Sequence, residues 1–173
     1  MNIGLLLFLI TGQGAKKQKD TFKIEIPAFL DTKYIPSKYT CDGKDVSPEI
    51  VFKNIPEKAK SIAIIADDPD APMGTWVHWV IYNIPKDTTH LKEGFPEGMK
   101  VGNICQGIND FGKYAYGGPC PPSGAHRYFF KAYALDTVFD CQKHMTKKDL
   151  LKLMKGHIIA QDTLMKRYRR IKR

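Results

Sequence analysis

Residues 61–72 read SIAIIADDPDAP, and they are the most informative segment for predicting the fold. Its first part, residues 61–67, is an apolar run of strand length. Because consecutive positions are apolar, both faces of such a strand are expected to be buried, either inside a sheet or between two sheets. Residues 77–84 (VHWVIYNI) and 127–135 (RYFFKAYAL) have the same character. The three runs predict a β-rich core.

The two flanks of this core predict further elements. Residues 22–29 alternate apolar side chains and indicate a strand that ends near Pro27. Thr146 followed by Asp149 is typical of a helix start, and Gly156 of a helix end. Residues 157–170 are interpreted as a second helix, with Ile158, Gln161, Met165 and Tyr168 along one side. Long Gly- and Pro-rich stretches between the strands are expected to be loops, namely residues 69–75, 85–112 and 116–124.

Composition limits the class of protein. The chain has 173 residues, with 43% hydrophobic and 26% charged residues. These values suit one globular domain and exclude a disordered chain, a collagen, a coiled coil and a polytopic membrane protein. The net charge is +9, and six basic residues lie in residues 166–173, so the remainder is only +3. We interpret this basic end as cations that complement the dipole of a terminal helix, and predict no nucleic-acid partner.

The N-terminus predicts export. Residues 3–10 (IGLLLFLI) are too few to span a bilayer but suit the core of a signal peptide. Residues 1–14 are therefore expected to be a signal peptide or disordered leader, and residues 20–173 a single domain. A misassigned start or a buried N-terminal strand is the alternative. The predicted location is periplasmic or secreted, with the cytoplasm as the alternative. In an oxidising compartment, three full pairings of the cysteines are open: these are Cys41, Cys105, Cys120 and Cys141.

Polar side chains follow the strands at informative places. Asp67, Asp68 and Asp70 come at the end of a buried strand, where carboxylates need partners or solvent. The bond between Ala71 and Pro72 is a candidate cis peptide. His78 lies inside an apolar strand and needs a hydrogen-bond partner or must stay neutral.

A second polar group surrounds a rigid loop. Residues 116–124 (YGGPCPPSG) combine glycines that permit close approach with prolines that stiffen the backbone, which suits an anion-binding concavity. His126 and Tyr128 share one face of the next strand, and Arg127 takes the other. Two imidazoles backed by carboxylates, a phenol and loop N–H groups predict a pocket for phosphate or a carboxylate.

Four segments together resemble a known family. They are YTCDG (39–43) with Ser47-Pro48, DDPDAP (67–72), VHWVIYNIP (77–85) and GGPCPPSGAHRY (117–128). In this order they resemble the phosphatidylethanolamine-binding proteins, and more closely the bacterial Raf kinase inhibitor-like branch, over residues 22–170. The resemblance implies a mainly β fold of two packed β-sheets with C-terminal helices. It also implies a small pocket for phosphate or a phospholipid headgroup, and a non-enzymatic role as a binder and modulator of kinases or proteases.

The resemblance also implies which residues bind the ligand. Asp68 and Asp70 match the Asp-Pro-Asp motif, and Cys120 stands where animal members keep a glycine. The implied ligand-binding residues are Asp68, Asp70, His78, Gly118, Cys120, His126 and Tyr128. No cofactor or metal is implied, and a homodimer is plausible by resemblance.

Three other functions compete with anion binding. Cys120 with His126 or His78 as base would make a cysteine-dependent hydrolase. Asp68, His78 and His126 together would suit zinc. The long segment 86–112 would present a loop to a protease or kinase, although nothing in it resembles a substrate.

Overall fold

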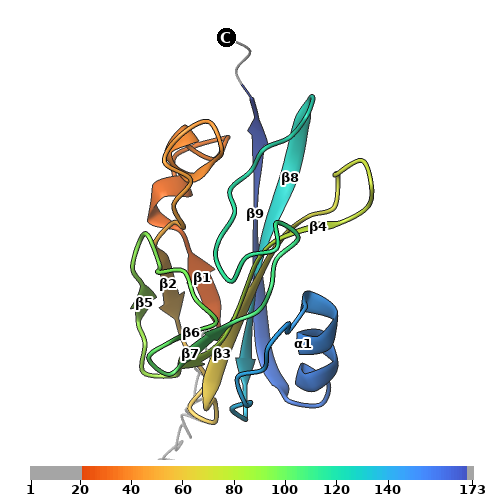
Figure 1. Ribbon diagram of the computed structural model, residues 1–173. Coiled ribbons are helices and arrows are strands. Elements are labelled where there is room, and N and C mark those ends of the chain that lie inside the picture. Colours follow the sequence, from red (N-terminus) through yellow and green to blue (C-terminus); the bar gives the residue numbers. More distant parts are fainter. Residues whose placement is uncertain (1–20, 171–173) are drawn as a thin grey trace, which may run out of the picture.

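The computed structural model describes residues 21–170 and contains two antiparallel sheets and one short α-helix (Figure 1). The smaller sheet has the strand order β1-β2-β5, and the larger has the order β6-β7-β4-β3-β8-β9. The strands are β1 (Lys23–Glu25), β2 (Ile50–Lys53), β3 (Ser61–Asp68), β4 (Trp76–Pro85), β5 (His90–Leu91), β6 (Lys100–Val101), β7 (Ile104–Gln106), β8 (Ala125–Leu135) and β9 (Ile158–Arg169). The prediction of a mainly β fold of two sheets is confirmed.

Strand β3 lies in the middle of the larger sheet, between β4 and β8. All eight of its residues are buried, as its continuous apolar pattern predicts. Alternate side chains of β3 enter two separate cores. Ile62 and Ile64 belong to the core between the sheets, whereas Ala63 and Ile65 belong to the core on the other face.

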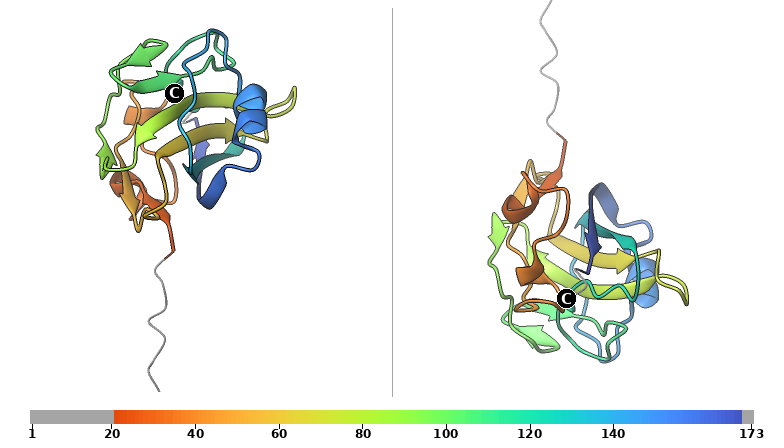
Figure 2. Two further views of the ribbon diagram at one scale, coloured as in Figure 1. Left: turned by 90° about the horizontal axis from the view of Figure 1, so that it is seen from below. Right: turned by 90° about the horizontal axis from the view of Figure 1, so that it is seen from above.

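The second core is covered by α1 (Lys147–Met154), which lies on the side of the large sheet away from the small sheet (Figures 1 and 2). Leu150 and Met154 are its buried residues. The helix begins as predicted, because the Thr146 hydroxyl accepts a hydrogen bond from the Asp149 N–H. Among residues 21–170, no helix is long and apolar enough to cross a membrane.

The predicted second C-terminal helix is wrong. Residues 158–169 form β9, which pairs with β8 from Ala125↔Arg169 to Leu135↔Ile158. The prediction placed Ile158, Gln161, Met165 and Tyr168 on one helical side, a spacing of three and four residues. In the strand, alternate residues face the core instead, among them Ala160, Leu164 and Tyr168. Met165, expected on the same helical side as Tyr168, is 42% exposed while Tyr168 is 5% exposed.

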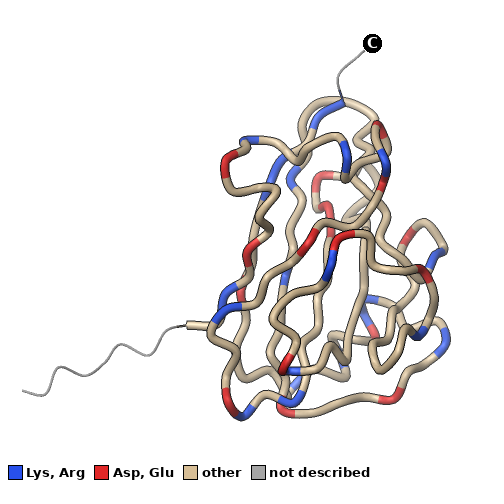
Figure 3. The backbone as a smooth tube through the Cα atoms, turned by 90° about the vertical axis from the view of Figure 1, so that its left-hand side faces the viewer, with Lys and Arg blue, Asp and Glu red and all other residues tan. Residues whose placement is uncertain are grey.

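The interpretation of the basic C-terminus changes accordingly. There is no terminal helix dipole to complement at Arg170, which instead forms an ion pair with Asp42 at 2.9 Å. Basic and acidic residues are interspersed along the described chain (Figure 3). The residues of the predicted leader and Lys172 and Arg173 lie outside the described residues.

Three smaller expectations also need correction. The first predicted strand is shorter, because β1 ends at Glu25 and a 3-10 helix follows at Pro27–Phe29. The predicted loop 85–112 contains β5, β6 and β7, whose two or three residues each are too short to show a periodic pattern. The Ala71–Pro72 bond is trans, and no cis peptide occurs in the described part of the chain.

The four cysteines form two disulfides, which selects one of the three pairings left open by the sequence. Cys41 is bonded to Cys120, and Cys105 to Cys141. Cys105 is fully buried in the core beneath α1, whereas Cys41 and Cys120 are exposed. The first bridge therefore lies at the surface and the second reaches into the core.

The buried carboxylate of Asp67, near the end of β3, is stabilised by two lysines. Its side chain is completely buried, and its carboxylate forms ion pairs with Lys131 of β8 at 2.7 Å and Lys147 of α1 at 2.5 Å. A buried carboxylate is stable only when it is paired. Because its two lysine partners lie in β8 and α1, Asp67 links the helix to the sheet through ion pairs.

Replacing Asp67 by asparagine should lower the free energy of unfolding by about 2–4 kcal/mol, because two ammonium groups lose their shared partner. Chemical denaturation measures this change. Lys23→Gln is the matched control: it removes an ion pair whose lysine is 57% exposed, and should change stability by less than about 1 kcal/mol. Equal effects of the two substitutions would contradict the role given to Asp67.

Candidate functional site

A cavity of about 320 Å³ lies where β3 ends and β4 and β8 begin. Because these strands are antiparallel neighbours, their ends meet at one edge of the large sheet, at the upper end of β8 in Figure 1. The cavity collects side chains from the three strand ends and from two loops. Its lining consists of Asp68, Ala71, Pro72, Trp76, His78, Phe111, Cys120, Pro121, Pro122, His126 and Tyr128.

His126 is held by a buried carboxylate. Its Nδ1–H donates to the Asp68 carboxylate across 2.7 Å, and both side chains are at most 10% exposed. Asp68 and Asp67 are consecutive residues of a strand, so their side chains point to opposite faces of the sheet. Asp68 therefore reaches the cavity while Asp67 reaches the lysines. The pair leaves Nε2 of His126 as the ring nitrogen available to a guest.

His78 enters the cavity from a β-bulge. Ala66 pairs with Trp79 but Asp67 pairs with Val77, so His78 is an extra residue on β4. Bulges re-aim side chains and occur often beside functional sites. Its Nδ1–H donates to the Gly117 carbonyl at 2.6 Å. Burial lowers the pKa of His78 below 6.5, against the opposing effects of that hydrogen bond and of Asp68. The ring is thus neutral near pH 7, and its Nε2 carries a lone pair.

Tyr128 is the unusual group of the cavity. Its side chain lies on the same face of β8 as His126, as the alternation predicts, and it is 3% exposed. Among the residues that the structure describes, its hydroxyl has no hydrogen-bond partner. Burial, the charge of Asp68 and a weak contact of the hydroxyl with the Asp68 carboxylate raise the pKa of Tyr128, so the hydroxyl keeps its proton and is a donor without a well-formed hydrogen bond. Its ring contacts the ring of His78, with the centroids 5.2 Å apart.

An aromatic wall closes another side of the cavity. The Phe111 ring lies 5.4 Å from the rings of both Trp76 and His78. Sequence reasoning did not select Phe111, because it lies in a long loop where no periodicity links it to the strands. A Cβ atom at Gly117 would collide with the Phe111 ring, so glycine is needed there for this close approach.

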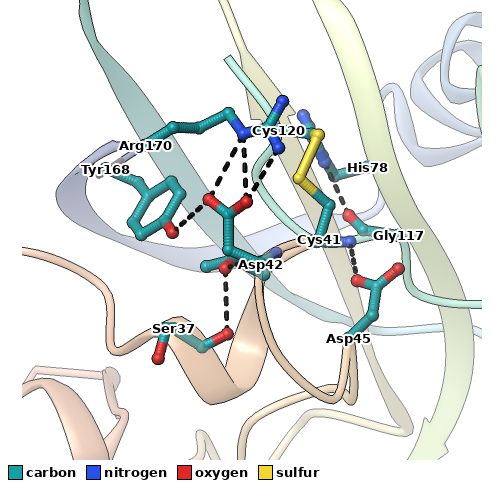
Figure 4. Close-up of a disulfide and its surroundings, with 11 residues drawn as sticks. Ser37, Cys41, Asp42, Asp45, His78, Gly117, Cys120, Tyr168 and Arg170 are labelled. Carbon is teal, nitrogen blue, oxygen red and sulfur yellow. Dashed lines mark hydrogen bonds and ion pairs between the residues drawn. A yellow bond between two sulfur atoms is a disulfide. The ribbon is translucent and has the colours of Figure 1, made fainter. Parts of the chain in front are cut away.

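The rim of the cavity is formed by residues 117–122. The Gly118 N–H donates to the Asp45 carboxylate at 2.6 Å, and Cys120 is tied to Cys41 by the disulfide (Figure 4). A Cβ at Gly118 would collide with the backbone of Tyr39 and Thr40. Asp45, which positions this rim, was also missed by sequence reasoning, because it lies far from the rim in the chain.

The structure brings five of the seven predicted residues into the cavity lining: Asp68, His78, Cys120, His126 and Tyr128. Gly118 and Asp70 lie outside it. The N–H of Gly118 is already occupied by Asp45. The carboxylate of Asp70 accepts two hydrogen bonds from the Arg127 guanidinium and one from its backbone N–H, and these bonds lower the pKa of Asp70 to about 2. Both residues support the walls of the cavity.

The geometry argues against the cysteine-dependent hydrolase and against the zinc site. Cys120 is in a disulfide and so has no thiol to act as a nucleophile. Within residues 21–170, no group of three His, Cys, Asp or Glu side chains is arranged to hold a metal ion. The Nδ1 atoms of both histidines are directed to protein acceptors instead.

Comparisons with known proteins identify the family. The family model for phosphatidylethanolamine-binding proteins matches residues 25–169. A UPF0098 protein of Methanothermobacter thermautotrophicus is 51% identical over 145 residues, which cover 83% of this chain and 95% of that protein. A UPF0098 protein of Aquifex aeolicus is 49% identical over 146 residues, covering 83% of this chain and 85% of that protein.

Solved structures agree with this assignment. The crystal structure of a phosphatidylethanolamine-binding protein homologue, CT736 of Chlamydia trachomatis, has a TM-score of 0.80 and 39% identity, and covers 87% of this chain and 99% of its own. Escherichia coli YbcL has a TM-score of 0.78 and 27% identity, and covers 88% of this chain and 100% of its own. The chain belongs to the phosphatidylethanolamine-binding protein family.

The pKa of His78 gives a test of the site geometry. Because its folded-state pKa is lowered, the unfolded chain binds a proton here first as the pH falls below 6.5, and His78 then contributes a loss of stability on acidification. NMR of the imidazole should show a neutral ring protonated at Nδ1 and a titration midpoint below 6.5. A midpoint above 6.5, or a proton on Nε2 in the neutral ring, would contradict the geometry.

Proposed function

We propose that the protein binds a small phosphate-type anion in this cavity. The observation that carries the proposal is the buried Tyr128 hydroxyl, which has no partner among the described residues. A buried polar group without a hydrogen bond costs about 1–3 kcal/mol. A guest that accepts a hydrogen bond from Tyr128 removes this cost, so the cavity favours a ligand with acceptor oxygens.

The two imidazoles define the ligand further. The Nδ1–H of His126 is engaged by the Asp68 carboxylate, so Nε2 is the ring nitrogen that faces an anion in the cavity. Neutral His78 offers an Nε2 lone pair and so accepts a hydrogen bond. A singly protonated phosphate or phosphomonoester has both kinds of oxygen, whereas an ionised carboxylate has only acceptors. The chemistry therefore favours phosphate over acetate.

The apolar side of the cavity suits a phosphoester. Trp76, Phe111 and Pro72 also line the cavity and can cover the carbon atoms next to a phosphate, as in a phospholipid headgroup. The proposed role is binding without catalysis. This is supported by the absence of a free thiol from the described residues and by membership of a family of binding proteins.

The proposed location is periplasmic or secreted, with the cytoplasm as the alternative. Two disulfides in one small domain support an oxidising compartment. Fractionation of the native host, with the N-terminal mass of the mature chain, tests this proposal. A kinase or protease partner and a homodimer stay predictions, because no contact in the described residues favours either.

Isothermal titration with phosphate, phosphoethanolamine and acetate tests the binding role. We expect saturable binding of the two phosphate compounds, weaker binding of acetate, and a loss of about tenfold or more in His126→Gln, which removes one imidazole from the cavity. The absence of heat with every anion, or equal affinity for acetate and phosphate, would contradict the proposal.

Tyr128→Phe separates ligand binding from folding. Without ligand, the variant should be as stable as the wild type or up to about 1 kcal/mol more stable, because it removes an unpartnered hydroxyl. Its affinity for phosphate should nevertheless fall about tenfold. Titration and denaturation of the same samples measure both quantities.

Tyr116→Phe is the matched control. The Tyr116 hydroxyl donates to the Tyr39 carbonyl at 2.9 Å, so its removal should lower stability by about 1–2 kcal/mol and leave phosphate affinity nearly unchanged. The opposite result for the pair, with Tyr128→Phe less stable and still binding phosphate normally, would overturn the role given to Tyr128.

A further inference from the structure

The Cys41–Cys120 disulfide lies at the mouth of the cavity. Cys120 is one of the lining residues, and both cysteines of this bridge are exposed. The other bridge includes Cys105, which is fully buried. A reductant in solution therefore reaches the bridge beside the cavity more easily than the bridge beneath α1.

Apart from the burial of Pro121, this bridge is the main attachment of residues 120–124 to the rest of the protein. Before Cys120, the rim is attached by hydrogen bonds, from Gly118 N–H to Asp45 and from Cys41 N–H to the Pro119 carbonyl at 3.2 Å. Between residue 120 and the start of β8, the described structure contains no hydrogen bond or ion pair to the rest of the protein. Pro121 and Pro122, which line the cavity, have no N–H to donate.

The other end of the bridge is firmly anchored. Next to Cys41, the Asp42 carboxylate accepts hydrogen bonds from the Tyr168 hydroxyl at 2.7 Å and from the Arg170 guanidinium at 2.9 Å (Figure 4). The Thr40 N–H donates to the Ser37 carbonyl. Because the Cys41 side is tied to the end of β9, breaking the bridge should release residues 120–124 and leave the Cys41 loop in place.

We propose that the Cys41–Cys120 disulfide is a redox modification site whose state controls the anion cavity. A dithiol reductant attacks one of the two sulfurs, the S–S bond breaks, and a mixed disulfide forms. The second thiol of the reductant then resolves it. Two electrons and two protons pass to the protein, which gains two thiols, while the reductant becomes a disulfide.

Opening the disulfide should weaken ligand binding, because the disulfide holds Pro121 and Pro122 in place at the cavity. With the bridge closed, Pro121 and Pro122 are held against the space that the two histidines and Tyr128 line. With the bridge open, binding must also order this segment, and that entropy cost lowers affinity. The effect on affinity rests on the proposed function, whereas the selective opening of the bridge and the mobility of the rim do not.

Selectivity is tested by limited treatment of the full chain with dithiothreitol, followed by alkylation and mass spectrometry. Cys41 and Cys120 should be labelled well before Cys105 and Cys141. Labelling of Cys105 and Cys141 first, or of all four together, would overturn the proposal. Backbone ¹⁵N relaxation of the selectively reduced protein should then show larger motions at Cys120, Ser123 and Gly124 than in the oxidised protein, and no change in α1. Unchanged relaxation at these three residues would also overturn it.

Control of binding is tested by titrating inorganic phosphate into the oxidised protein, the selectively reduced protein and the double variant Cys41→Ser with Cys120→Ser. Reduction and the double substitution should each weaken binding about tenfold, and the variant should not respond further to dithiothreitol.

Cys105→Ser with Cys141→Ser is the matched control and should keep the affinity of the oxidised protein and its response to dithiothreitol. Equal affinity in all forms would overturn control of the cavity. If the oxidised protein binds no phosphate, the proposed function fails, and the labelling and relaxation results still decide the redox site.

Discussion

The hydrogen bond between Asp68 and His126 is the interaction on which the site depends. Strand β3 is buried along its whole length and ends in two carboxylates on opposite faces of the sheet. Each carboxylate is accommodated by a different partner, lysines for Asp67 and an imidazole for Asp68. The first arrangement holds the helix to the sheet. The second fixes the orientation of a histidine at the edge of a cavity, with its Nε2 left for a guest.

The rest of the cavity is assembled around this pair by backbone irregularities. A bulge turns His78 inward, and the Gly117 carbonyl fixes which of its nitrogens carries the proton. The glycines of the rim allow the loop to approach Phe111 on one side and the Tyr39 backbone on the other. The neutral His78, the acid-backed His126 and the unpartnered Tyr128 offer different hydrogen-bonding roles within one small space. Such a set of groups selects a ligand by the protonation of its oxygens as well as by its charge.

Sequence reasoning predicted the parts of the structure that rest on strong local patterns. The fully apolar strands, the Thr146 helix start and the shared face of His126 and Tyr128 follow from periodicity and capping. The assignment of β9 as a helix failed because its residues can be arranged at helical spacing of three and four as well as in alternation, and pairing with β8 decided between them. Phe111, Asp45 and the disulfide pairing depend on contacts between distant segments, which no local pattern encodes.

The five histidines of the chain allow one direct measurement of the central claim. Phosphate is titrated into isotope-labelled protein at neutral pH, and the imidazole resonances are followed by NMR. The account predicts saturable shifts at His78 and His126 with a common dissociation constant, and no saturable shifts at His90, His144 or His157, which lie outside the cavity lining. Phosphate shifts of equal size at all five histidines, or none at His126, would contradict it.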